Sequence, residues 1–277
     1  MFNIVHLSWD VSVAEETKQT QSYTVPPVER AFRLLRYIGE GNRCVNISKA
    51  SKALGINRTT LIRLIQTLQA EKMIEEISEG AGYQLGTGLI GLASEALSSR
   101  DIVRVSRPIL RQLAKTLNLS SHLGVLDGQE IIYLDRETPN THLVSNVAAG
   151  TRLPAHATSI GRILLANLPE ESVRNLYQES KLEKFSDRTS TNIDQLLTQL
   201  TNDRSIGLAW STSNFEKGIG SCAAPVFDHL GIPAGAINVS GPESAFVEGT
   251  QSYLDIDSAL RSAATEISKL LGYSPKH

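Results

Sequence analysis

Apolar residues recur at steps of three and four from the Pro26-Pro27 pair onward, and this spacing predicts an amphipathic helix that ends at Gly39 and Gly41. A second short apolar stripe begins after Asn46 and closes at Gly55. Asn57 then stands where it can cap a third helix that runs to about Ala70. The pattern is therefore helix, short glycine-containing turn, helix.

Two short strands are predicted next, at Ile74–Ile77 and Tyr83–Leu85, joined by a glycine-rich loop that contains Glu79 and no lysine or arginine. Three helices followed by a hairpin describe a winged helix-turn-helix, which we place at residues 25–86. The segment before it, residues 1–24, has no periodic pattern and is expected to be a flexible extension. A further apolar stripe at residues 87–100 predicts a linker helix.

The rest of the chain, residues 101–275, mixes β-rich runs with helical stripes. The strands follow one another mostly as hairpins, with helices inserted between them, and this order predicts an α+β domain with an antiparallel sheet. The predicted strands are Ser121–Leu126, Glu130–Asp135, His142–Val147, Ala209–Phe215, Gly220–Phe227 and Gly235–Ser240; the predicted helices are Val105–Leu117, Thr158–Leu168, Glu170–Gln178, Ile193–Asp203 and a last one around Leu260–Leu271.

Composition narrows the possible classes of protein. With 277 residues, 41% of them hydrophobic, the chain can bury cores for two domains, and its formal net charge of -2 excludes a protein that coats nucleic acid through bulk positive charge. The two cysteines, Cys44 and Cys222, form no metal-binding pair, so we expect no metal, no cofactor and a reducing, cytoplasmic setting. No apolar run approaches the length of a membrane helix, and no membrane partner is expected.

The third helix nevertheless lies in a locally cationic window. From Asn46 to Gln66 there are four basic residues and no acidic residue. Helical geometry turns the third helix's leucines to one side and Thr59, Arg63 and Gln66 to the other. Such a face is often a solvated surface, but with the preceding turn and the following hairpin it predicts contact with double-stranded DNA. The candidate DNA-contact residues are Lys49, Arg58, Thr59, Thr60, Arg63 and Gln66.

At these residues the chain resembles the IclR-type bacterial transcriptional regulators, from about Val25 to Gly272. The resemblance is carried by the strings Val28–Ala31, Gly55–Ile65, Leu153–Ala166, Ala223–Asp228 and Val239–Pro242. It implies a winged helix-turn-helix, a linker helix and a GAF-like effector-binding domain. It also implies homodimers or dimers of dimers on operator DNA.

The resemblance further implies a small effector, most simply a carboxylate, held by backbone N–H groups of Ser159 and Ile160. Unpaired amides at a helix start favour an anion on physical grounds as well. Many members of the family have an Asp and a Cys where this chain has Ser211 and Ser221. We therefore expect a neutral, hydroxyl-lined pocket and a ligand different from the small oxo acids that some relatives bind. The other wall candidates are His142, Ser145, Leu153, Trp210 and Ile219.

Two other functions remain open. The second domain could be ligand-free, which would leave an architectural DNA-binding protein. It could instead be an enzyme that uses Cys222 or His156, although no base and orienting group are apparent near the thiol. We interpret Cys222 as a buried core residue and His156 as a histidine bonded into the turn before the helix.

Overall fold

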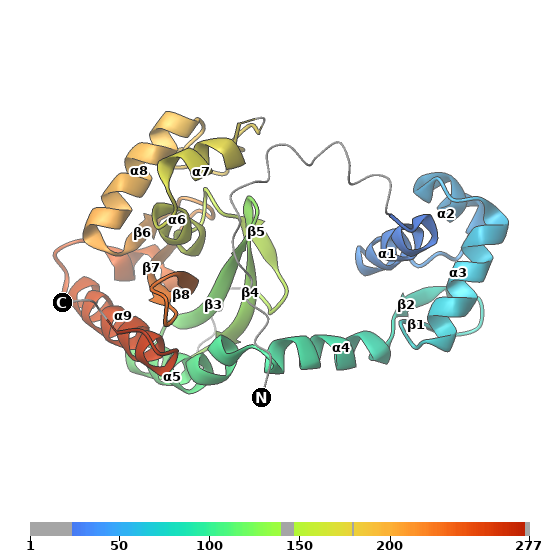
Figure 1. Ribbon diagram of the computed structural model, residues 1–277, viewed down its shortest axis with the longest axis horizontal. Coiled ribbons are helices and arrows are strands. Elements are labelled where there is room, and N and C mark those ends of the chain that lie inside the picture. The colour runs from blue at the N-terminus through green and yellow to red at the C-terminus, as the bar shows by residue number, and fades with distance from the viewer. Residues whose placement is uncertain (1–23, 140–146, 179, 275–277) are drawn as a thin grey trace. The chain divides into compact units, whose positions relative to one another are not determined.

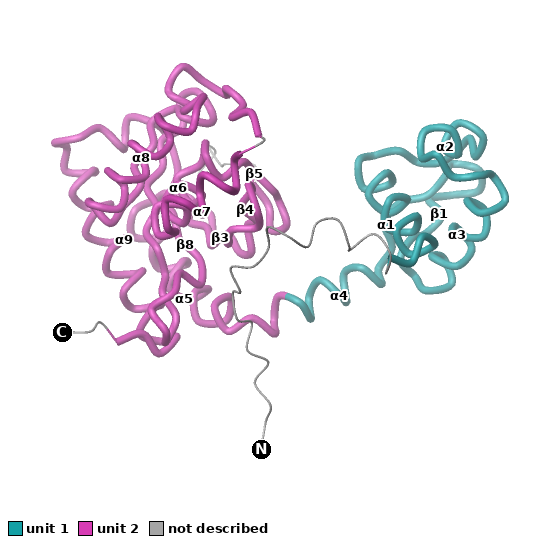
Figure 2. The backbone as a smooth tube through the Cα atoms, turned by 45° about the horizontal axis from the view of Figure 1, so that its top comes forward, with its two compact units in different colours: residues 1–96 teal, residues 97–277 magenta. Residues whose placement is uncertain are grey.

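The computed structural model describes residues 24–139, 147–178 and 180–274. The chain divides into two compact units, residues 1–96 and residues 97–277 (Figure 2). The division falls inside a helix that the sequence predicts as the linker, a few residues before the expected boundary at Arg100.

The first unit is a winged helix-turn-helix, as predicted. Its elements are α1 (Pro26–Gly39), α2 (Ile47–Leu54), α3 (Arg58–Ala70), β1 (Ile74–Glu76), β2 (Tyr83–Leu85) and α4 (Thr87–Ser98), the helix in which the division falls. The strands β1 and β2 pair antiparallel. Leu34, Ile56, Leu61 and Ile65 are fully or almost fully buried, so the apolar sides of the helices meet in one small core.

The turn between α2 and α3 depends on its local residue types. Gly55 ends α2 with a φ of 63°, in the left-handed region that glycine adopts without a side-chain clash. The Asn57 side chain accepts a hydrogen bond of 2.8 Å from the Thr60 amide and so caps α3. These two residues stop one helix and start the next within three positions.

The second unit contains a six-stranded antiparallel sheet in the order β5-β4-β3-β8-β7-β6. Its strands are β3 (Ser120–Asp127), β4 (Glu130–Glu137), β5 (Arg152–Pro154), β6 (Ala209–Thr212), β7 (Ile219–Phe227) and β8 (Pro233–Pro242). In the centre, His122 lies opposite Asn238 on β3 and β8, and Ser221 lies opposite Ser240 on β7 and β8. The predicted α+β class with an antiparallel sheet is confirmed.

Helices cover both faces of this sheet (Figure 1). One face packs against α5 (Asp101–Leu117) and α9 (Gln251–Leu270), and the other packs against α6 (Ser159–Ala166), with α7 (Glu170–Leu176) and α8 (Ile193–Ile206) outside α6. A 3₁₀ turn, Glu243–Phe246, follows β8. Since side chains alternate between the two faces of a strand, each strand supplies residues to two separate cores.

The structure departs from the predicted elements in a few places. The helix predicted from Val105 begins at Asp101, and the strand predicted to reach Phe215 ends at Thr212, because Ser213 adopts a φ of 59°. The three-residue strand β5 and the 3₁₀ turn were not predicted, since both are too short to show a period. The strand predicted at His142–Val147 lies almost entirely outside the described residues.

In the part of the chain that the structure describes, no helix combines the length and the apolar character needed to cross a membrane.

The start of α6 comes very close to the chain before it, and we expect Gly161→Ala to destabilise the second unit. A Cβ at Gly161 would lie 2.2 Å from the Ala155 carbonyl oxygen, so the backbone must shift. The expected loss in the free energy of unfolding is about 1 to 3 kcal/mol, measured by urea denaturation. Gly91→Ala, in the exposed helix α4 with nothing within 4 Å of the added Cβ, is the control and should stabilise by up to about 1 kcal/mol. Equal stability of Gly161→Ala and the wild type would contradict the close approach.

Candidate functional site

The first candidate surface is the outer side of α3 together with Lys49 on α2. Arg58, Thr59, Arg63 and Gln66 are exposed on α3, Lys49 is exposed on α2, and Thr60 is half-buried. The opposite side of α3 carries Leu61, Ile65 and Leu68, all buried. The predicted orientation of the helix is therefore confirmed, and its outward side presents hydroxyl, amide and guanidinium groups.

The wing contributes a different chemistry. Glu75 on β1 accepts a hydrogen bond of 2.6 Å from Gln84 on β2, and Glu76 accepts one of 3.3 Å from the Gly80 amide at the tip. The wing is thus rich in carboxylates, whereas α2 and α3 carry no acidic residue. The surface of α2 and α3 therefore attracts a polyanion more strongly than the wing does.

The second candidate site is built around the N-terminus of α6. Thr158 caps the helix: its Oγ1 accepts from the Gly161 amide at 3.2 Å and donates to the Pro154 carbonyl at 3.2 Å. The amides of Ser159 and Ile160 have no hydrogen-bond partner among the described residues. Two N–H groups and the positive end of the helix dipole therefore remain open.

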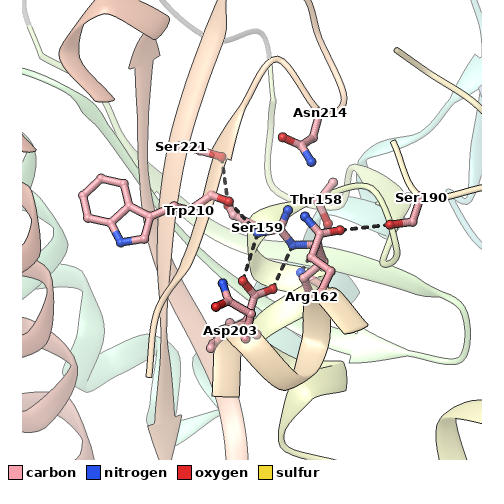
Figure 3. A network of polar contacts seen from close by, with 12 residues as sticks. Thr158, Ser159, Arg162, Ser190, Asp203, Trp210, Asn214 and Ser221 are labelled. Atoms are coloured by element: carbon pink, nitrogen blue, oxygen red, sulfur yellow. Dashed lines mark hydrogen bonds and ion pairs between the residues drawn. The ribbon is translucent and has the colours of Figure 1, made fainter. Parts of the chain in front are cut away.

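A chain of polar side chains crosses the sheet beside these amides. The Ser159 Oγ accepts a hydrogen bond of 2.9 Å from Ser221, drawn in Figure 3, and one of 3.4 Å from the Asn238 Nδ2. The Asn238 Oδ1 in turn lies 2.9 Å from the His122 Nδ1. The chain links α6 to β7, β8 and β3, and its members are at most partly exposed.

These groups line a cavity of about 70 Å³ between α6 and the sheet. Leu153, Ser159, Ser211, Ile219 and Ser221, all predicted as site residues, contribute to its walls, together with His122, Tyr133, Asn238 and Ser240, which were not predicted. The exposed Glu216 also lines it, so the cavity is not as neutral as the sequence suggested.

Trp210 does not contribute its side chain to the cavity, contrary to expectation. Its ring stacks on Tyr253 of α9, with 3.8 Å between ring centroids, and its register partner is Cys222. Both residues face α9, because neighbours of Ser211 and Ser221 on a strand point to the opposite face. Figure 3 shows the ring turned away from Ser159.

Ile160 is fully buried in the core beneath α6 and its side chain does not line the cavity; its amide has no hydrogen-bond partner among the described residues. His142 and Ser145 lie outside the described residues.

A buried ion pair anchors α6 behind the cavity. The Arg162 guanidinium binds the Asp203 carboxylate of α8 through bonds of 3.0 and 3.3 Å and also donates to the Trp210 carbonyl (Figure 3). Burial raises the pKa of Asp203 to about 6, against the opposing effect of Arg162. Losing one member would leave a buried charge without its partner, which is strongly unfavourable.

Two sequence models, described as the IclR helix-turn-helix domain and the bacterial transcriptional regulator IclR C-terminal domain, match residues 27–78 and 94–269. The chain belongs to the IclR family. The XynR transcriptional regulator of Escherichia coli K12 is 28% identical over 90% of this chain and 98% of its own length.

Solved structures of the IclR fold agree with this assignment. An IclR transcriptional regulator from Alicyclobacillus acidocaldarius superposes with a TM-score of 0.78 at 25% identity, covering 90% of this chain and all of the other. An IclR homolog from Microbacterium hydrocarbonoxydans, solved in complex with 4-hydroxybenzoate, has a TM-score of 0.75 at 22% identity, covering 90% of this chain and 100% of the other.

The two residues that an enzymatic hypothesis would use, Cys222 and His156, are both buried in this IclR protein. Cys222 is fully buried among apolar side chains, and burial raises the pKa of its thiol. The His156 Nε2 lies 3.0 Å from the Glu183 carbonyl oxygen, and its ring packs near Tyr177 and Phe185. His156 thus lies in the turn before α6, as interpreted, but its hydrogen bond runs to Glu183 and not within the turn.

The sequence contained a signal for the residues that were missed. His122 and Asn238 are polar residues inside predicted strands, and each alternates with buried apolar neighbours such as Leu123 and Ile237. A polar side chain at an inward-facing strand position must find a partner, so such positions are candidates for a polar network. Their pairing needed the register of β3 against β8.

His122 should make the stability of the protein sensitive to acid. Burial lowers its pKa from 6.5 to about 4, with Arg136 adding to this effect and the bond to Asn238 opposing it. Between those values the unfolded chain binds a proton that the folded chain does not, so stability is lost as the pH falls from 6.5 towards 4. The contribution is roughly 3 kcal/mol at full extent.

The measurement is urea denaturation at several pH values between 4 and 7.5, taken as the difference between His122→Gln and the wild type. The raised pKa of Asp203 makes the folded state more stable as the pH falls, but this contribution is present in both proteins and cancels in the difference. His229→Gln, on an exposed turn, is the control and should keep the wild-type slope. A slope for His122→Gln identical to that of the wild type would refute the assignment.

Proposed function

We propose that this IclR-family regulator binds its operator through the exposed side of α3 and that a small carboxylate in the α6 cavity controls this binding. The observation that carries the proposal is the pairing, in one chain, of an acid-free cationic helix surface with open amides at the start of a buried helix. The first suits a polyanion and the second a single anionic group.

The residues of α3 divide by their place along the helix. Arg58, Thr59 and Thr60 lie in its first turn, where hydroxyls, a guanidinium and backbone amides suit phosphate. Arg63 and Gln66 lie further along, where bidentate hydrogen bonding suits guanine and adenine edges in the major groove. Lys49 on α2 adds a phosphate contact.

Control by an effector requires that the ligand bind better in one of two arrangements of the protein, one that holds DNA and one that does not. We place the mechanical connection in α4 and propose a homodimer or dimer of dimers that acts in the cytoplasm. The exposure of Ile90 and Leu92 on α4, at 69% and 60%, supports self-association. A two-fold dimer would require a roughly palindromic operator.

The two alternatives have less support. A ligand-free second domain would not explain the open amides beside a polar cavity. An enzyme acting through Cys222 would need an accessible thiolate, and this thiol is buried on the sheet face opposite the cavity.

Arg63→Ala tests the DNA surface. If Arg63 contacts a base, we expect a loss of about 1 to 3 kcal/mol on the specific operator and a smaller loss on unrelated DNA, because discrimination depends on the base edge. Fluorescence anisotropy at fixed salt measures both affinities. The matched control is Lys115→Ala, an exposed cation on α5 of the second unit, which should bind like the wild type. Unchanged operator affinity of Arg63→Ala would contradict the proposal.

Ser159→Pro tests the effector site. Proline suits the first position of a helix, and Thr158 before it is already extended, with φ -102° and ψ 150°, so the fold should tolerate the change. In a thermal-shift panel of carboxylates, a binding acid should raise the Tm of the wild type with concentration, and Ser159→Pro should weaken that binding at least tenfold by removing one amide donor.

Ser159→Ala, which keeps the amide, separates the hydroxyl's contribution from that of the backbone. A binding acid that shifts the Tm of Ser159→Pro and the wild type equally would place the carboxylate elsewhere.

A further inference from the structure

The polarity of the hydrogen bonds around Ser159 leaves one proton unassigned. A hydroxyl has one donor and two acceptor positions. The Ser159 Oγ accepts from Ser221 and from Asn238, so both acceptor positions are used. Its own proton is left to be donated towards the cavity, beside the open amides of Ser159 and Ile160.

At the other end of the network, His122 offers the cavity a hydrogen-bond acceptor and no donor. The Asn238 amide directs its Nδ2 to Ser159, so its Oδ1 faces the His122 Nδ1 and can only accept. His122 must therefore carry its proton on Nδ1. Burial keeps the ring neutral, since it lowers the pKa to about 4, and Nε2 is left with a lone pair.

This lone pair is an unmet acceptor. The His122 side chain is 1% exposed, lines the cavity, and has no hydrogen-bond partner at Nε2 among the described residues. A buried acceptor without a donor costs free energy that a suitable ligand atom would recover. The Ser240 Oγ also lines the cavity and has no partner within those residues. Because a hydroxyl can donate or accept, Ser240 does not decide whether a ligand atom there must be a donor or an acceptor.

We propose that the effector of this protein carries a hydroxyl group in addition to its carboxylate. The carboxylate accepts from the Ser159 hydroxyl and the amides of Ser159 and Ile160, and the ligand hydroxyl donates to the His122 Nε2. This inference rests on the proposed effector function. It adds a specificity rule: an acid of the same shape without a donor leaves Nε2 unpaired and binds less well.

Isothermal titration of the full-length protein with two matched series tests the rule. One series is glycolate, acetate and methoxyacetate; the other is 4-hydroxybenzoate, benzoate and 4-methoxybenzoate. In the series whose size fits, the hydroxylated acid should bind at least tenfold more tightly than the unsubstituted acid. The methoxy acid, which keeps the oxygen and lacks the proton, should show no such gain.

His122→Phe should abolish the preference for the hydroxylated acid, read as the ratio of the affinities for the hydroxylated and unsubstituted acids within the same variant. His156→Phe is the matched control, because the His156 Nε2 already has Glu183 as its partner. Should His122→Phe fail to fold, the tautomer of His122 in the wild type gives an independent measurement. Nitrogen-15 NMR of the ring should show a protonated Nδ1 and a bare Nε2, with Nε2 shifting when the hydroxylated acid binds.

The outcomes separate the two proposals. Acids that bind equally with and without the hydroxyl, or a proton found on Nε2, overturn the specificity rule and leave carboxylate control intact. Failure of all six acids to bind counts against the effector function itself, and the rule falls with it.

Discussion

The close contact of helix α6 with the central sheet is the constraint on which the second unit depends. Gly161 allows the helix to touch the backbone at Ala155, and the buried pair of Arg162 and Asp203 ties it to α8. This position brings the open amides of α6 within reach of side chains from β3, β7 and β8. Burying two charges costs desolvation free energy, and this ion pair fixes the position of α6 and so of the open amides at its start.

The alternation of side chains along the strands divides the second unit into two functional halves. On β6 and β7, Ser211 and Ser221 face the cavity, while Trp210 and Cys222 face α9 and pack in an apolar core. The same rule explains why the thiol is buried and why the tryptophan ring packs against α9. The α9 face of the sheet is thus apolar, whereas the α6 face combines an apolar core with the polar cavity.

The geometry of the first unit depends mainly on interactions between residues close in sequence. Capping residues and one left-handed glycine set the angle between α2 and α3, and a small core holds the inner side of α3. The outer side of α3 contributes little to that core, so its residues are free to serve recognition. Membership of the IclR family agrees with this division between a DNA-binding unit and a C-terminal unit with a small polar cavity.

Periodicity, capping residues and turn signals in the sequence determined the helix-turn-helix, the hairpins, the α+β class and the outward side of α3, because each depends on neighbours within a few positions. They also pointed to the start of α6. Tertiary structure alone decided that His122 on β3 meets Asn238 on β8, 116 residues away, and that Trp210 faces α9. Strand register and the choice of sheet face are set by packing between distant segments, and no local pattern contains that information.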